Sequence, residues 1–284
     1  MTERTRTEPA VTVADRVTYE WGARKRPYVH PLRTPAGQTL TRNAPDDHPW
    51  HHGLWFTIKL VNEENFWEEY DAYGVLRHDA EPTVSEDGDD VTVAGSLTWT
   101  RPDRETVALR EERTWAYRPL DDDAYALDFE TTLVAPTDVV YDRTPFTTWG
   151  GYGGLAFRGA GDWHDTRLLL DHGEARERAL GERSAWCALD GLAGDDDRPV
   201  GIAFLAAPDS PRYPVPWYAS TRAATYGDEG WSNFCNAAFL WDEALAVPAG
   251  EPLSFAYRVV VHDGTWDGDR IATAHDDYVR DRGR

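Results

Sequence analysis

The chain has 284 residues, of which 41% are hydrophobic, and its 29 basic and 50 acidic side chains give a formal net charge of −21. An anionic surface repels nucleic-acid phosphates and acidic lipid headgroups, so this composition argues against nucleic-acid and membrane-surface partners. No apolar run approaches the ~20 residues of a membrane-spanning helix, and 13 Trp and 13 Tyr residues argue against intrinsic disorder. A chain of this length can bury one large core, and we expect a single domain over residues 1–284.

The chain has two cysteines, Cys187 and Cys235, and neither belongs to a CxxC pair. This spacing predicts no disulfide framework and no cysteine zinc site, so we expect buried free thiols. The first residues, MTERTRTEPAV, lack the apolar segment of a signal peptide. We therefore expect a cytoplasmic protein, while the sequence indicates no particular oligomeric state.

Strand patterns dominate, as runs of alternating or continuously apolar residues. The expected strands cover residues 17–21, 53–61, 91–100, 106–117, 125–134, 154–157, 167–170, 184–189, 200–206, 237–241 and 253–262. Turn-forming clusters lie between them at 85–90, 119–123, 191–197 and 248–252. Their acidic residues lack the spacing of a calcium loop, so we expect solvated hairpin tips.

One helix is expected near the end of the sequence. Its apolar positions recur with helical spacing at Ile271, Ala274, His275, Tyr278 and Val279. Asp269 is the expected N-cap. About a dozen strands with short turns and no alternation of strands and helices predict an all-β fold. We expect a large antiparallel β-sandwich with this short C-terminal helix lying on a sheet.

The segment 41–55, TRNAPDDHPWHHGLW, is the densest in chemical groups. His48, His51 and His52 fall within five positions, and two nearby prolines exclude a regular helix. Histidine exchanges protons near neutral pH and is the commonest metal ligand. We therefore expect these three histidines to be catalytic, on a shaped loop that precedes the strand at 53–61.

A carboxylate follows soon after this strand. If the strand turns back near residue 62, Trp67 and Glu68 return beside the histidines. Glu68 is the expected partner carboxylate, either as an acid or base in proton transfer or as part of a histidine–carboxylate metal site. The residues alone do not distinguish these two uses.

Two further segments have the composition of ligand-binding loops. Residues 147–158, TTWGGYGGLAFR, predict a tight bulged turn that places Arg158 nearby, and residues 208–220 contain four prolines that stiffen a loop with exposed arginine and aromatic side chains. The expected substrate-binding residues are Arg42, Trp55, Trp67, His78, Arg158, Arg212 and Trp217. The GxSxG, HExxH, GxGxxG and Walker A motifs are absent from the sequence, which disfavours serine hydrolases, zincins and nucleotide-binding proteins.

Residues 47–56, DHPWHHGLWF, resemble the D-H-P-H-H-R-G-[IL]-W-F signature of the PmoA-like family. Further matching positions are Arg26-Pro27-Tyr28, Pro31-Leu32 and Arg42 upstream, then Trp67 with Glu68 or Glu69, and the segments 74–78, 150–158, 201–217 and 257–264. His48 and His51 match the signature best. Trp50 stands where the family often has His, and His52 stands where it often has Arg or His.

The resemblance implies a galactose-mutarotase-like supersandwich. Its members tend to accompany sugar-processing enzymes, which favours carbohydrate chemistry by association. The family name refers to methane oxygenase, but an acidic sandwich without a membrane span does not resemble a membrane copper oxygenase subunit.

Three functions are therefore weighed. The first is an enzyme acting on a sugar or glycoside by histidine and carboxylate acid–base chemistry, as an epimerase, a lyase or a glycoside-cleaving enzyme. The second is a metal-dependent enzyme built on the histidines, and the third is a non-catalytic carbohydrate-binding protein. We expect a small carbohydrate as the ligand and assign no cofactor, with a metal left open.

Overall fold

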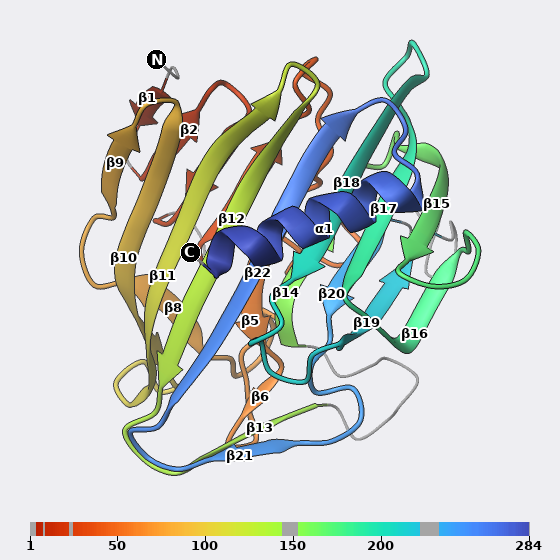
Figure 1. Cartoon of the computed structure of the whole chain (residues 1–284). Coiled ribbons are helices and arrows are strands. Elements are labelled where there is room, and N and C mark those ends of the chain that lie inside the picture. Colours follow the sequence, from red (N-terminus) through yellow and green to blue (C-terminus); the bar gives the residue numbers. More distant parts are fainter. Residues whose placement is uncertain (1–3, 8, 23–24, 144–152, 222–232, 284) are drawn as a thin grey trace.

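We describe a computed structural model of the chain over residues 4–7, 9–22, 25–143, 153–221 and 233–283 (Figure 1). Two nine-stranded sheets face each other, a smaller four-stranded sheet lies at one end, and one helix crosses the outer face of the second large sheet. Neighbouring strands pair antiparallel throughout the described residues. The predicted all-β antiparallel sandwich with a short C-terminal helix is confirmed.

The first sheet has the strand order β1 (Arg4–Thr7), β2 (Ala10–Val13), β3 (Val17–Glu20), β4 (Tyr28–Leu32), β5 (Leu54–Ile58), β14 (Gly153–Arg158), β20 (Phe234–Ala237), β19 (Val215–Ser220) and β16 (Arg178–Ser184). The second has the order β15 (His164–Leu170), β17 (Trp186–Ala193), β18 (Arg198–Ala206), β22 (Pro252–Asp263), β12 (Ala124–Val134), β11 (Val107–Asp121), β10 (Asp90–Thr100) and β8 (Val75–His78), with β9 (Thr83–Asp87) also paired to β10. The small sheet has the order β21 (Leu245–Val247), β13 (Val139–Asp142), β6 (Leu60–Val61) and β7 (Glu64–Asn65).

The long alternating strands agree best with the sequence pattern. Strands β10, β12 and β22 begin and end within one residue of the predicted bounds. Each of the four turn clusters spans the turn between two consecutive strands and overlaps a strand end. The predicted strand at 237–241 is wrong, because β20 ends at Ala237 and the chain then turns. The expected loop at 208–220 ends in a strand, β19, whose Pro216 carbonyl still accepts a backbone hydrogen bond from Ala238.

A continuous hydrophobic core fills the space between the two large sheets. One buried ion pair lies inside it: Arg113 Nε donates to Glu111 Oε1 at 2.6 Å, and both side chains are almost fully buried. Glu111 also accepts hydrogen bonds from Trp99 Nε1 and Thr131 Oγ1, each at 2.6 Å. Burial alone would lower the pKa of Arg113, but the Glu111 carboxylate raises it above its ordinary value. The Arg113 guanidinium is therefore charged at neutral pH, and hydrogen bonds hold the Glu111 carboxylate on several sides.

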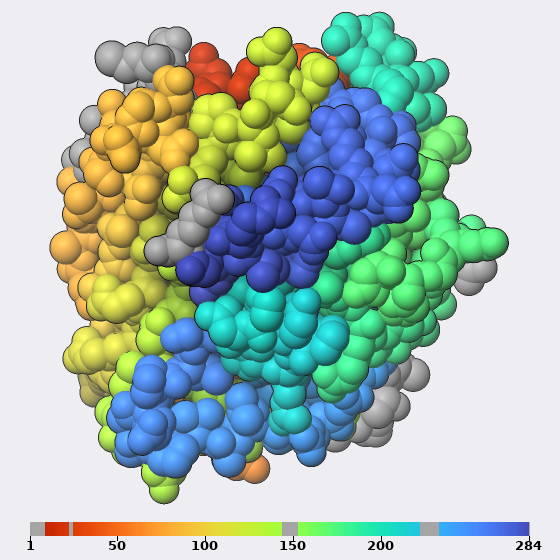
Figure 2. All heavy atoms as spheres, viewed as in Figure 1, coloured from red at the N-terminus to blue at the C-terminus, as the bar shows by residue number. Residues whose placement is uncertain are grey.

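Helix α1 (Gly268–Arg282) lies across the outer face of the second sheet, as the space-filling view also shows (Figure 2). It buries Ile271, His275 and Tyr278, and together with strand residues these form a second apolar cluster. The expected cap at Asp269 is wrong by two residues: Asp267 accepts the hydrogen bond from Arg270 N at 2.9 Å. The physical reason is that Asp269 already has helical backbone, whereas an N-cap residue is extended.

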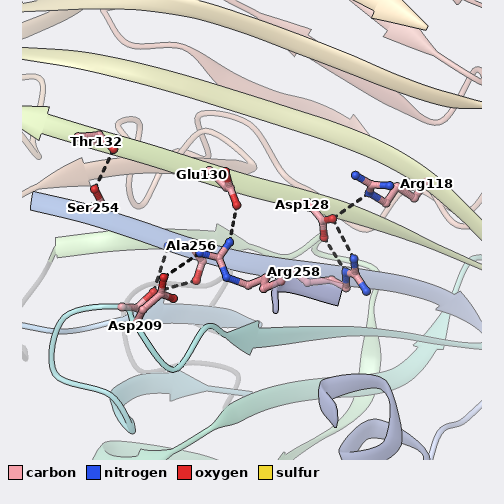
Figure 3. A network of polar contacts seen from close by, with 10 residues as sticks. Arg118, Asp128, Glu130, Thr132, Asp209, Ser254, Ala256 and Arg258 are labelled. Carbon is pink, nitrogen blue, oxygen red and sulfur yellow. Dashed lines mark hydrogen bonds and ion pairs between the residues drawn. The ribbon is translucent and has the colours of Figure 1, made fainter. Parts of the chain in front are cut away.

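Ion pairs attach the last turn of α1 to the sheet beneath it, and Figure 3 shows the strand residues of this network, among them Asp128, Glu130 and Arg258. Asp128 on β12 accepts two hydrogen bonds from Arg258, at 2.6 and 2.9 Å, and one from Arg118 at 3.0 Å. Arg258 also contacts Asp281 of the helix at 3.2 Å, and Arg282 of the helix is paired with Glu130 of β12. Because these groups come from both elements, the helix has one fixed position on the sheet. No helix among the described residues is long and apolar enough to cross a membrane.

The buried ion pair gives a stability prediction. The substitution Arg113→Leu leaves the Glu111 carboxylate buried without its cation, so we expect the free energy of unfolding to fall by about 3–5 kcal/mol. Urea unfolding followed by circular dichroism measures this change. The matched control is Arg110→Leu, at an exposed position of the same strand, with an expected change of about 0.5 kcal/mol or less. Equal effects of the two substitutions would contradict the role given to the pair.

Candidate functional site

The outer face of the first sheet carries its own aromatic cluster. A row of paired residues crosses the sheet from β4 to β19. From β4 to β14 the row is Tyr28, Trp55 and Ala156. It continues through Asn236 on β20 to Tyr218 on β19. Their sequence neighbours point into the core between the sheets, because successive side chains of a strand face opposite ways. The aromatic cluster contains Tyr28, Trp55, Trp67, Ala156, Tyr218, Phe234 and Ala238, with Trp50 and Trp241 packed against it.

The histidine loop, residues 42–53, is folded onto this aromatic cluster by its own backbone. Ala44 N donates to His51 O at 2.8 Å, and His51 N donates to His48 O at 2.9 Å. The loop ends at Gly53, whose φ is +68°. A side chain at this position would place its Cβ 2.5 Å from the backbone oxygen of Val29. Only glycine fits this close approach without strain, so Gly53 directs the loop into β5.

His51 lies within the aromatic cluster. Its ring stacks on Phe234, with centroids 5.3 Å apart, and on His48, with centroids 4.6 Å apart. Arg158 Nη1 lies 3.5 Å from His51 Nδ1. Burial, followed by the neighbouring His48 and Arg158 charges, lowers the pKa of His51 well below its ordinary value. His51 is therefore neutral near pH 7 and acts as a packed ring.

His48, Asp47 and Arg158 form a chain of polar contacts beside it. Arg158 Nη2 donates to Asp47 Oδ2 at 2.8 Å, and the same oxygen lies 2.9 Å from His48 Nδ1. Burial alone would raise the pKa of Asp47, but hydrogen bonds from His48 and Arg158 hold it below its ordinary value. An ionised carboxylate only accepts hydrogen bonds, so Nδ1 of His48 carries the proton and Nε2 is the basic nitrogen of the neutral ring. Burial lowers the pKa of His48, which favours this neutral form.

His52 takes part in a different ion-pair group. Its Nε2 lies 2.9 Å from Glu69 Oε1 and its Nδ1 lies 2.7 Å from Asn43 Oδ1, while its ring stacks on Tyr28. Arg26, which is 1% exposed, lies 3.5 Å from the same Glu69 oxygen. Burial alone would raise the pKa of Glu69, but the hydrogen bond from His52 and the Arg26 charge lower it. These contacts hold the histidine loop against the sheet.

The carboxylate in direct contact with a histidine lies one residue beyond the expected Glu68. Glu69, not Glu68, contacts a histidine, whereas Glu68 pairs with Lys59. Asn65 sets this arrangement, because its side-chain oxygen accepts hydrogen bonds from the backbone N–H groups of Trp67 and Glu68. The Glu68 charge nevertheless reaches His48, where it opposes part of the larger effect of burial on the histidine pKa.

The structure brings several predicted binding residues to the aromatic cluster. Trp55 and Trp67 lie inside it with their rings 5.5 Å apart, and Arg158 reaches the histidine loop. Arg42 lies at the start of the loop, and its backbone N–H donates to Arg158 O at 2.9 Å. Of the glycine-rich segment expected to form a bulged turn, residues 147–152 lie outside the described residues, and 153–158 form β14.

The structure corrects the predicted placement of three others. Trp217 faces the core between the sheets and donates to Ser184 O at 3.0 Å; its neighbour Tyr218 faces the aromatic cluster. Successive residues of a strand face opposite sides of the sheet, so an error of one residue exchanges the two faces. For this reason the sequence pointed to Trp217, although Tyr218 is the residue that faces the aromatic cluster. His78 belongs to a strand of the second sheet, with its Nε2 2.7 Å from Tyr19 Oη, and Arg212 is paired with Glu243.

Sequence reasoning assigned no role to several residues that the structure places in the site. These are Arg26, Asn43, Asp47, Glu69 and Phe234. Asp47 was the one with a local signal, because a carboxylate directly before a histidine can orient its ring. Phe234 is distant in sequence and joins the site only through strand pairing.

No group of three or more His, Cys, Asp or Glu side chains in the part of the chain that the structure describes could hold a metal ion. The histidine rings stack on one another or contact carboxylate and amide groups instead of pointing at one common position.

Comparison with known proteins places the chain in a family. A family model matches residues 10–276. The chain belongs to a family of unknown function, DUF6807. No curated protein matches the chain.

Solved structures with a similar fold include two described by their titles as sugar-related. One is a galactose mutarotase related enzyme from Lactobacillus acidophilus, with 8% identity and a TM-score of 0.42 over 93% of this chain and 98% of that one. Another is an aldose epimerase homologue from C. elegans, with 6% identity and a TM-score of 0.34 over 94% of this chain and 99% of that one. At these values the likeness transfers no activity to this chain.

Histidines with lowered pKa values make stability depend on pH. Burial lowers the pKa of His30 and His262 to about 4 and that of His78 to about 3, and that of His51 is also low. In the unfolded chain these groups take up protons near pH 6.5, so the unfolded state binds more protons than the native state below that pH. We expect the free energy of unfolding to fall as the pH drops from 7 to 4.5. Urea midpoints across this range measure the slope, which His262→Gln should reduce; a constant midpoint would contradict the prediction.

Proposed function

We propose that the protein is an enzyme that acts on a small carbohydrate by proton transfer between imidazole and carboxylate groups. The observation that carries the proposal is the Arg158–Asp47–His48 chain of contacts at 2.8 and 2.9 Å on an aromatic-lined face. Arg158 holds the pKa of Asp47 down, Asp47 fixes the ring of His48 through Nδ1, and Nε2 is the basic nitrogen of the neutral ring. This is the arrangement that a general base requires.

The chemistry follows from the charges around His48. When Nε2 takes a proton from the substrate, the ring becomes a cation, and the Asp47 carboxylate at 2.9 Å stabilises it. Glu68, which is paired with Lys59 and whose charge reaches His48, is the carboxylate of the proposed acid–base pair. Proton transfer beside a carbonyl or anomeric carbon is common to epimerases, lyases and glycoside-cleaving enzymes, and the proposal extends to that shared step.

An exposed aromatic ring, with a half-buried ring beside it, supports a sugar as the substrate. Among the described residues, Tyr70 is the aromatic side chain in the group of large exposed hydrophobics, at 52% exposure. Its ring lies 5.2 Å from that of Trp50, which in turn lies 5.3 Å from that of His48. Exposed rings next to polar groups suit a ligand that has both C–H faces and hydroxyl groups. A sugar has both.

The two other functions from the sequence analysis have less support. A metal-dependent enzyme would need a set of ligands that the described residues do not form. A non-catalytic carbohydrate-binding protein would use the same aromatic rings but would not need a histidine oriented by a carboxylate. The PmoA-like and mutarotase-like resemblances of the sequence agree with the proposed carbohydrate chemistry and remain predictions.

The role of His48 gives a test of activity. Wild-type protein and His48→Gln are incubated with aldoses, keto-sugars and glycosides, and turnover is followed by NMR. We expect His48→Gln to lower turnover by about 100-fold or more, because general acid–base groups contribute that much. The control is His164→Gln, at an exposed histidine that contacts Asp197. Equal turnover in wild type and His48→Gln would refute the assignment, while saturable binding without product would favour the binding protein.

The exposed rings give a separate test of binding. Tyr70→Ala removes a stacking surface outside the proton-transfer groups, so we expect KM to rise about tenfold with kcat little changed. The control is Leu180→Ala, which removes another exposed apolar side chain from β16. A loss confined to kcat would show that Tyr70 does not hold the ground-state substrate.

A further inference from the structure

Cys187 and Cys235, expected to be buried free thiols, meet across the core of the sandwich. Cys187 lies on β17 of the second sheet and Cys235 on β20 of the first, and both thiols are free and at most 1% exposed. Their sulfur atoms are 3.6 Å apart, with the Cys235 thiol directed at Cys187. They are the two cysteines of the chain, 48 positions apart, and neither has a part in the proposed proton transfer.

We propose that Cys187 and Cys235 are an oxidation site, at which an intramolecular disulfide links the two large sheets. A disulfide needs sulfur atoms about 2.05 Å apart, so the two atoms must approach by about 1.5 Å. Small side-chain rotations supply a movement of this size. Each thiol already has the other as its nearest reaction partner, and in the folded protein no other thiol competes.

The oxidant is a peroxide, such as hydrogen peroxide. It oxidises one thiol to a sulfenic acid and releases one water molecule. The second thiol then attacks the sulfenic sulfur, forms the S–S bond and releases a second water molecule. Two thiols and one peroxide therefore give one disulfide and two waters, with two electrons passing from the sulfur atoms to the peroxide.

Burial sets the rate and selectivity of this reaction. Burial, with a smaller effect of the Cys187 contact, raises the pKa of the Cys235 thiol well above its ordinary value. A thiol that holds its proton reacts slowly, and a buried thiol excludes bulky reagents. We therefore expect slow oxidation by peroxide and little exchange with oxidised glutathione in the folded protein.

The disulfide would act on stability and not on the proton-transfer groups. It closes a loop of 48 residues and so reduces the conformational entropy of the unfolded chain. It also prevents the two large sheets from separating completely. We expect the melting temperature of the oxidised protein to exceed that of the reduced protein by about 5 °C.

The test uses the wild-type folded protein. It is treated with hydrogen peroxide, quenched and measured by intact mass and by peptide mapping. The expected result is a loss of about 2 Da with one cross-linked peptide joining Cys187 and Cys235, and a higher melting temperature that dithiothreitol reverses. Cys235→Ser, treated in the same way, should show neither the mass loss nor the shift in melting temperature.

Three outcomes would overturn the proposal. The first is a gain of about 32 Da at either cysteine without a cross-link, which marks sulfinic acid. The second is a covalent dimer in place of the internal bond. The third is two unreacted thiols in the folded protein when the urea-unfolded chain oxidises under the same peroxide. All three readings come from wild-type protein, so they stand even if Cys235→Ser fails to fold.

Discussion

The central strands of the first sheet are buried on both faces, and the rest of the structure depends on this constraint. Every side chain of β5, β14, β19 and β20 is buried. One face closes the core against the second sheet, and the other carries the aromatic cluster. A sheet with one wet face could not supply a dry support for histidine rings. The histidine loop is therefore placed by packing, and its polar contacts are made on top of that packing.

Inside this dry support, the charged groups come in pairs. Arg158 lies against Asp47 and Arg26 against Glu69, and in the core between the sheets Arg113 lies against Glu111 in the same way. Burying a single charge would be costly, whereas a pair with good hydrogen bonds holds its geometry. The same pairing lowers the pKa values of Asp47 and Glu69, which allows the ionised Asp47 to orient His48. Structural stability and the proposed chemistry thus use the same contacts.

The sequence predicted the features that depend on local pattern. Long alternating strands such as β12, the acidic hairpin tips and the helix near residue 271 all follow from side-chain periodicity. It also located the histidine loop, because three histidines in five positions form a local signal. The choice between neighbours, Glu69 over Glu68 and Tyr218 over Trp217, depends on register and on a side-chain turn at Asn65. Strand pairing between distant segments determines these positions, and a short stretch of sequence carries no information about that pairing.

Partners from distant parts of the chain were out of reach for the same reason. Phe234 reaches His51 only because β20 pairs with β14, and Arg26 reaches Glu69 only because β4 pairs with β5. Each site contact of this kind joins segments separated by many residues. Composition and spacing identify the residue types of the site, and the strand order decides which of them meet.

The helix on the second sheet has a consequence for the order in which the chain is made. Its residues follow every strand of that sheet in sequence, yet they cover apolar side chains of β17, β18 and β22 that are synthesised earlier. During translation these strands can pair before α1 has been made, so an apolar strip faces solvent or a chaperone until α1 leaves the ribosome. The contacts of Asp281 with Arg258 and of Arg282 with Glu130 then form last, when the helix covers the strip. The outer surface of the second sheet is therefore completed late, after synthesis of its strands.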